Sequence, residues 1–184
     1  AKDAIRFTQL TPQSSWTRPS VASLITSLYP NQHGCHDRQD RLRNDVVPLE
    51  RVFTATDVYE THGIIANPNL LPYWGFGDGF NRYLDLCAGE QANVDDARVF
   101  DAAIDAVQHL AGHPWYIYVH AMGPHDPYIP PEPYNTMFPP PYKLGMAKEE
   151  YVGPHQARRT QDLRSQYDGE IAYTDAQFGR LVQQ

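Results

Sequence analysis

The stretch that decides the fold is Trp115–Tyr128, which reads WYIYVHAMGPHDPY. Its first part, residues 115–122, is aromatic and β-branched almost throughout, which is typical of a strand. Because apolar residues follow one another without alternation, we expect this strand to be buried on both faces, as in a parallel sheet covered by helices. The segment that follows, residues 124–141, is rich in proline, cannot pair inside a sheet, and is predicted to be a loop.

Helical periodicity lies on both sides of this strand. The spacing of apolar residues predicts helices at 20–28, 48–59, 94–110 and 156–184. A short buried strand is predicted at 63–67, and an ordered loop is predicted at 72–89. Asn93 is the predicted N-cap of the third helix. Helices that alternate with strands predict an α/β fold, with helices packed on a mostly parallel sheet.

The composition of the 184 residues excludes some classes of function. The formal net charge is −7, no basic run is long, and acids interrupt the densest one, at residues 37–43, so no nucleic-acid groove is predicted. No apolar run approaches the ~20 residues that a membrane-spanning helix needs, so this chain is expected to carry no membrane segment. Cys35 and Cys87 lack the spacing of a metal site, and they fit either two free thiols or one disulfide.

A second stretch, Gln13–Gly34, places a hydroxyl directly before a predicted helix. Thr17 stands before Arg18 and Pro19, where a threonine fits the helix N-cap. The same place also fits a nucleophile, because free N–H groups and the positive end of the helix dipole favour an anionic ester. The residues leave both roles open, and a nucleophilic threonine needs a base or a metal ion to activate it.

Two further polar residues follow predicted strands, where α/β sheets bind their ligands. His125 lies between prolines, and it fits either a group that binds an anionic oxygen and protonates a leaving group or a local backbone cap. Asn67 ends the strand at 63–67, and it fits either a site residue or a turn residue. The carboxylates on the predicted helices are expected on solvated faces: Asp95, Asp96, Asp101, Asp105, Asp168, Glu170 and Asp175.

Three segments in this order resemble the sulfatase family of the alkaline-phosphatase superfamily. SSWTRPSVASLITSLYPNQHG, residues 14–34, resembles the family signature Cys/Ser-x-Pro-Ser-Arg with its following helix and His-Gly turn. YIYVHAMGPHDPYIPPEPY, residues 116–134, resembles the strand and histidine loop, and YDGEIAYTDAQFGRLV, residues 167–182, resembles the next helix. GIIANPNLLPYWGFGDGFNRYLDL, residues 63–86, fits a bacterial branch of the family. The resemblance implies an alkaline-phosphatase-like α/β sandwich, incomplete here, with residues 1–184 forming part of a sulfatase-like catalytic domain.

The resemblance also implies roles for single residues. Thr17 falls on the nucleophile position, where sulfatases carry a Cys or Ser that is oxidised to formylglycine and related phosphodiesterases and phosphoryl transferases use an unmodified threonine. His125 falls on a substrate-binding histidine, and Asn67 lies in the stretch nearest to the family's lysine-bearing segment. The chain departs from the family where Val21 replaces the signature arginine and Gly123 replaces an Asp that precedes the histidine.

Family members bind a divalent ion, and calcium is the expected one. In this chain Thr17 matches a metal ligand, whereas the Asp-bearing motifs that supply the other ligands have no match, so we expect the chain alone to be inactive and its gene to be longer. The expected function is metal-dependent hydrolysis of a sulfate or phosphate ester of a small molecule, glycan or lipid. The alternatives are a phosphoryl (phospho-headgroup) transferase and a catalytically inactive anion-binding module. The sequence does not fix the compartment, and a periplasmic or extracellular location agrees with the resemblance.

Overall fold

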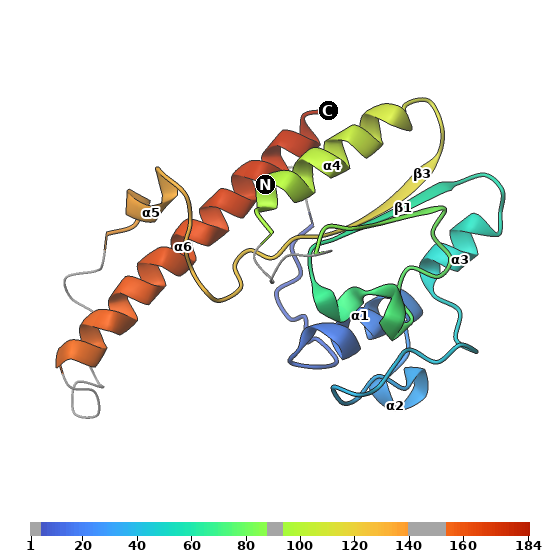
Figure 1. Ribbon diagram of the computed structural model, residues 1–184, viewed down its shortest axis with the longest axis horizontal. Coiled ribbons are helices and arrows are strands. Elements are labelled where there is room, and N and C mark those ends of the chain that lie inside the picture. The colour runs from blue at the N-terminus through green and yellow to red at the C-terminus, as the bar shows by residue number, and fades with distance from the viewer. Residues whose placement is uncertain (1–4, 88–93, 140–153) are drawn as a thin grey trace. The chain divides into compact units, whose positions relative to one another are not determined.

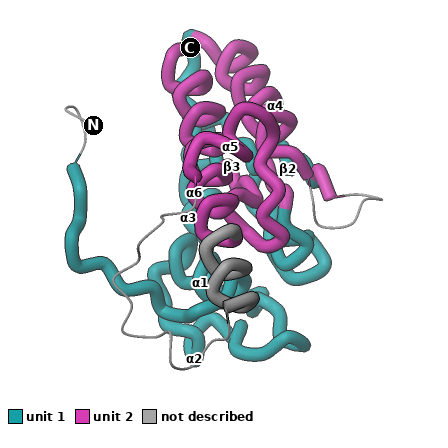
Figure 2. Tube along the Cα trace, turned by 90° about the vertical axis from the view of Figure 1, so that its left-hand side faces the viewer, with its two compact units in different colours: residues 1–63, 67–85, 112–118 teal, residues 64–66, 86–111, 119–184 magenta. Residues whose placement is uncertain are grey.

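The computed structural model describes residues 5–87, 94–139 and 154–184, with side chains from residue 163 onward in the last segment. The chain divides into two compact units (Figure 2). Unit 1 comprises residues 1–63, 67–85 and 112–118, and unit 2 comprises residues 64–66, 86–111 and 119–184. Within the described residues, no helix combines the length and apolar character that crossing a bilayer requires.

The strands form one parallel sheet in the order β2-β1-β3 (Figure 1). They are β1, Glu60–Ile65; β2, Arg82–Asp85; and β3, Trp115–His120. The N–H of Glu60 donates to the Pro114 carbonyl at 3.1 Å, and the N–H of Ala66 donates to the His120 carbonyl at 3.0 Å. The register therefore advances equally and in the same direction along β1 and β3, as parallel pairing requires. The predicted α/β class with a parallel sheet flanked by helices is confirmed.

The most buried strand is β1 rather than β3. Residues from Thr61 to Ile65 are all buried, whereas Trp115 is exposed and the rest of β3 is half-buried. The expectation that residues 115–122 are buried on both faces is therefore wrong for the described chain. The physical reason is position, because β3 lies at the edge of the described sheet and β1 lies between two neighbours.

The predicted helices are present, with shifted ends. The helical elements are α1, Thr17–Thr26; α2, Pro30–His33; α3, Leu49–Thr54; α4, Asp96–His109; α5, Tyr134–Met137; α6, Pro154–Val182; and the 3-10 helices η1, Pro68–Leu70, and η2, Pro72–Trp74. The helix predicted at 48–59 shortens to α3, and β2 lies in a segment that was predicted as loop. The predicted cap Asn93 lies outside the described residues, and Asp95 caps α4 by accepting a hydrogen bond from the Ala97 N–H at 2.9 Å.

In unit 2, α4 runs alongside α6 (Figure 1). One side of α6 is exposed, since Tyr167, Ile171 and Phe178 are 38%, 43% and 51% exposed. The buried side includes Tyr173 and Gly169. A Cβ at Gly169 would lie 2.6 Å from a backbone carbonyl oxygen of α5, so a glycine is required where the two helices meet.

Unit 1 contains a buried carboxyl group with an unpaired oxygen. Glu50, in the first turn of α3, is 1% exposed, and its Oε2 has no hydrogen-bond partner among the described atoms. Burial raises the pKa of Glu50 to about 7, although its own backbone N–H and the charge of Arg51 oppose the shift. The group is therefore largely protonated in the folded chain at mildly acidic pH, when an exposed glutamate has already ionised.

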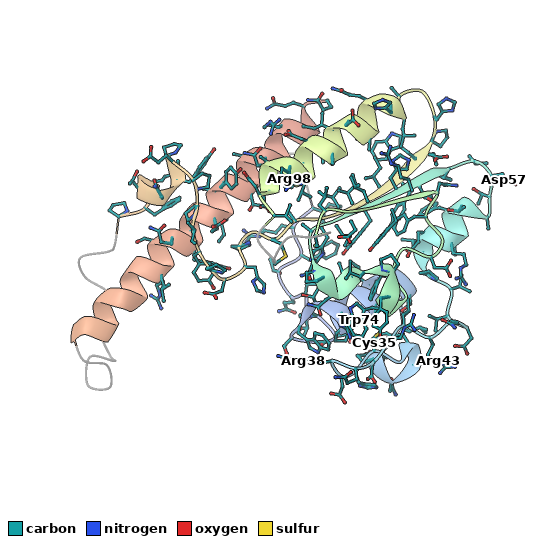
Figure 3. The ribbon with its side chains drawn as sticks, viewed as in Figure 1. Cys35, Arg38, Arg43, Asp57, Trp74 and Arg98 are labelled. Carbon is teal, nitrogen blue, oxygen red and sulfur yellow. The ribbon has the colours of Figure 1, made fainter. Side chains whose placement is uncertain are left out.

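We expect the stability of the folded chain to fall as the pH rises from about 4.5 to about 7. Over that window the unfolded chain has released the Glu50 proton and the folded chain still holds it. The contribution of Glu50 to stability is therefore fully present at pH values below its pKa in the unfolded chain, and it is lost as the pH rises through its pKa in the folded chain. Glu50→Gln should flatten this dependence and raise the free energy of unfolding at pH 8 by ~3 kcal/mol. Asp57→Asn, at an exposed carboxylate of the same unit (labelled in Figure 3), is the matched control. Urea unfolding across this pH range is the measurement, and an unchanged slope in Glu50→Gln would contradict the prediction.

Candidate active site

Thr17 is the first residue of α1, not its cap. Trp16 occupies the N-cap position and makes no side-chain capping bond, so the predicted capping role of Thr17 is wrong. The first turn of α1 contains no acidic residue, and Pro19 has no N–H to donate. No side chain of this turn therefore neutralises the positive end of the α1 dipole, and that end remains suited to an anion.

Asn67 is brought next to Thr17 by the turn that follows β1. Its Nδ2 donates to Thr17 Oγ1 at 3.5 Å, while its Oδ1 accepts from the Asn69 N–H at 2.9 Å and so caps η1. Asn67 is only 4% exposed. The turn role that the sequence left open is thus filled by Asn67, whereas its site role stays a prediction. Unit 1 brings two predicted site residues together.

His125 lies in unit 2, in the loop after β3. Its backbone N–H donates to the Met122 carbonyl at 2.8 Å, and its Nδ1 lies 2.6 Å from the Asp126 carbonyl oxygen. Since a carbonyl only accepts, Nδ1 carries a hydrogen and Nε2 is the nitrogen left for a ligand. The side chain is exposed and lines a cavity of about 350 Å³. Thr17 and His125 belong to different units, so each is placed only within its own unit.

The cavity beside His125 is acidic. Asp95, Asp96, Asp126 and Glu170 line it, and among the described residues that form its wall there is no lysine or arginine. Burial raises the pKa of Glu170, whose Oε1 accepts from the Ile129 N–H at 2.8 Å. Carboxylates repel an anion, so this cavity by itself is poorly suited to a sulfate or phosphate group.

Asp96 was predicted to be solvated, and the structure corrects this. It is 4% exposed, its Oδ1 accepts from the N–H groups of Met122 at 3.1 Å and Gly123 at 3.2 Å, and its Oδ2 accepts from the Thr174 hydroxyl at 2.6 Å. A Cβ at Gly123 would lie 2.6 Å from Asp96 Oδ2 and 2.3 Å from Thr174 Oγ1. The carboxylate that the family places at position 123 has no room here, because a carboxylate from α4 occupies that space. A signal was available, since Asp96 shares the helical face of the buried Val99.

His33, in the His-Gly turn, is a structural residue. It is 0% exposed, and its Nδ1 accepts from the Cys35 N–H at 3.1 Å. Its Nε2 therefore carries the hydrogen and donates to Ser23 Oγ at 3.0 Å. Burial lowers the pKa of His33, which favours this neutral form. A base must accept the proton of its nucleophile, so the Ser23–His33 pair is not a catalytic dyad.

Cys35 and Cys87 are both buried and are not joined in a disulfide, which answers the question left open by the sequence. Burial raises the pKa of the Cys35 thiol to about 11. A thiol with such a pKa carries little thiolate near neutral pH, so Cys35 is a poor nucleophile.

The described residues do not by themselves form the metal site that the resemblance implies. Among them no group of three or more His, Cys, Asp or Glu side chains is arranged to hold a metal ion. Thr17, the predicted ligand, lies beside the amide of Asn67 and offers one hydroxyl oxygen. Calcium takes about six to eight oxygen ligands, so one hydroxyl does not fit the ion, and calcium remains a prediction.

A parallel sheet flanked by helices defines the class as an α/β domain, and the solved structures that it resembles have alkaline-phosphatase-like folds. The sequence profile of the Sulfatase family matches residues 1–184, and the chain belongs to this family. Families of this type generally use divalent metals.

Two solved structures illustrate the likeness. The phosphonate monoester hydrolase of Agrobacterium radiobacter is 20% identical with a TM-score of 0.67, over 94% of this chain and 50% of that chain. Ps i-CgsB in complex with k-i-k-neocarrahexaose is 15% identical with a TM-score of 0.61, over 94% and 45%. At these identities the likeness shows the fold alone, and the chain spans about half the length of either structure. No curated protein matches the chain in sequence.

Proposed function

We propose that the chain forms the nucleophile-bearing part of a metal-dependent hydrolase of sulfate or phosphate esters, with Thr17 as the nucleophile. The observation that carries this proposal is the environment of Thr17. Its hydroxyl stands at the start of α1, where no acid neutralises the helix dipole and Asn67 Nδ2 is a donor at 3.5 Å. Membership of the sulfatase family supports ester hydrolysis as the class of reaction.

In the proposed reaction the Thr17 hydroxyl gives its proton to solvent water, and Oγ1 attacks the phosphorus or sulfur in line while the bond to the leaving-group oxygen breaks. Water then attacks the covalent Thr17 ester, breaks its bond to Oγ1 and restores the hydroxyl. The N–H groups at the start of α1 donate to the non-bridging oxygens, and Asn67 Nδ2 stabilises the attacking oxygen as its negative charge develops. His125 binds on the leaving-group side, where its Nε2 in the protonated form donates a proton to the departing oxygen. The proposed cofactor is a divalent metal ion, with calcium as the first candidate. Residues other than the described ones are proposed to supply its ligands.

A threonine at position 17 favours phosphate over sulfate esters within this proposal. The sulfatase route oxidises a Cys or Ser to formylglycine, and a threonine does not enter that route. Transfer of a phosphoryl group to an acceptor other than water is therefore the second candidate. The third candidate, an inactive anion-binding module, would also have to use the start of α1, because the cavity beside His125 is acidic.

The test is an assay of the protein that carries this chain with aryl sulfate, aryl phosphate, bis-aryl phosphate and aryl phosphonate substrates. Each substrate is tried with calcium, magnesium, manganese or zinc, and with a chelator. We expect turnover of a phosphorus ester that needs the metal and is lost in the chelator. An added alcohol that traps the phosphoryl group would indicate a transferase. Absence of turnover under all conditions, with phosphate still bound, would replace the hydrolase with the binding module.

A further inference from the structure

Arg18 follows the nucleophile position in sequence, yet its side chain is buried within unit 1. It is 2% exposed, and its guanidinium carbon lies 3.5 Å from the centroid of the Trp74 ring. Its Nη1 donates to the carbonyls of Arg38 and Asp40, both at 2.9 Å. Figure 3 shows Trp74 and Arg38 in the same part of the unit. The cation is thus held by carbonyl oxygens and by an aromatic face.

The other terminal nitrogen connects Arg18 to the turn that carries Asn67. Nη2 donates to Asn69 Oδ1 at 3.3 Å. The N–H of Asn69 donates to Asn67 Oδ1 at 2.9 Å, and Asn67 Nδ2 donates to Thr17 Oγ1 at 3.5 Å. A continuous path through one short turn therefore joins the guanidinium of Arg18 to the hydroxyl of Thr17.

Trp74 fixes the same turn from its other end. Its Nε1 donates to the Pro68 carbonyl at 3.1 Å, and its own carbonyl accepts from the Leu42 N–H at 2.9 Å. Gly75, the next residue, has φ +91°, and a Cβ there would lie 3.1 Å from the Leu42 carbonyl oxygen. The indole that stacks on Arg18 thus also holds the first residue of η1, directly after Asn67.

These contacts leave Arg18 unable to bind a substrate anion itself. Both terminal nitrogens are engaged, one face is covered by Trp74, and the side chain is almost fully buried. Its Nε is buried without a hydrogen-bond partner among the described atoms. An apolar side chain of similar shape would avoid the cost of burying a cation with an unsatisfied donor, so stability alone does not explain an arginine here.

We propose that Arg18 is a positioning residue, which holds the 67–69 turn so that Asn67 Nδ2 stays on the hydroxyl of Thr17. This inference rests on the proposed function, in which Thr17 is the nucleophile. A donor that is fixed in advance on the attacking oxygen stabilises charge that develops there. Loss of such positioning slows turnover more than it weakens substrate binding.

The test compares three variants that act on the path at different points. Arg18→Met removes the guanidinium and keeps most of the side-chain length, Asn69→Ala removes only the acceptor of Nη2, and a double variant combines both changes. Arg43→Met is the matched control, because Arg43 of the same unit pairs with Asp45 at the exposed surface. The readouts are the side-chain amide resonances of Asn67 in 15N NMR spectra and the separate values of kcat and KM on the best aryl ester.

We expect Arg18→Met and Asn69→Ala each to shift the Asn67 amide resonances and to lower kcat by ~10-fold or more, with KM little changed. The double variant should be no slower than the slower single variant, because both changes act through one turn. Arg43→Met should change none of these quantities. Arg18→Lys, which keeps the charge without the planar fork, should recover little of the loss.

Unchanged Asn67 resonances in folded Arg18→Met, or losses in kcat that add up in the double variant, would overturn the inference. If Arg18→Met does not fold, Asn69→Ala alone decides, since it leaves the buried cation in place. The NMR readout needs no activity, so it separates this inference from the proposed function. Turnover that survives in Thr17→Ala would refute the nucleophile, whereas the Asn67 resonances would still show whether Arg18 holds the turn.

Discussion

Replacing Thr17 by alanine is expected to lower kcat/KM of the protein that carries this chain by ~1,000-fold or more. The substitution removes the oxygen that forms the new bond to phosphorus or sulfur. The fold should survive, because Thr17 caps no helix end and its hydroxyl accepts one long bond, 3.5 Å from Asn67 Nδ2. We therefore expect the free energy of unfolding to change by less than ~1 kcal/mol.

Two further variants make this experiment specific. Thr17→Ser keeps a hydroxyl at the same place and should retain turnover that is readily measured. Thr26→Ala is the matched control, because Thr26 lies in the last turn of the same helix and donates to the Ala22 carbonyl at 2.6 Å. Its turnover should match that of the unsubstituted protein. Equal turnover in Thr17→Ala and Thr26→Ala would refute the nucleophile assignment.

Replacing Asp96 by alanine is expected to destabilise unit 2 by ~3–5 kcal/mol. The carboxylate accepts from two backbone N–H groups, of Met122 and Gly123, and from the Thr174 hydroxyl. Alanine would leave three partly buried donors without this partner. Because the N–H of His125 bonds the Met122 carbonyl, the loop that carries His125 should lose its protection against hydrogen exchange as well.

The control for Asp96 comes from the same helix. Asp101 pairs with Arg180 at 2.6 Å, and both side chains are about half exposed, so Asp101→Ala should cost less than ~1 kcal/mol. Asp96→Asn retains one oxygen acceptor for the two N–H groups and should fall between the alanine variants. Urea unfolding with hydrogen exchange on residues 122–125 measures both effects. If Asp96→Ala were as stable as Asp101→Ala, the carboxylate would not hold this loop.

The long, periodic elements could be predicted from the sequence, and the short ones could not. Both α4 and α6 were found because helical spacing persists over several turns, although their ends moved. By contrast, β2, α2 and α5 have four residues each, too few for either periodicity to show. The burial of β1 was predicted correctly, but the partial exposure of β3 was not, because the order of strands in the sheet decides it.

The sequence by itself determined the α/β class, the sulfatase family and the candidates Thr17, Asn67 and His125. Local spacing and motif order carry that information. The tertiary structure decided what buried polar groups bind: Arg18 meets Asn69, 51 residues away, and Asp96 meets Thr174, 78 residues away. The physical reason is that a buried donor or acceptor must find its partner inside the fold, and folding brings that partner from a distant segment that no local pattern identifies.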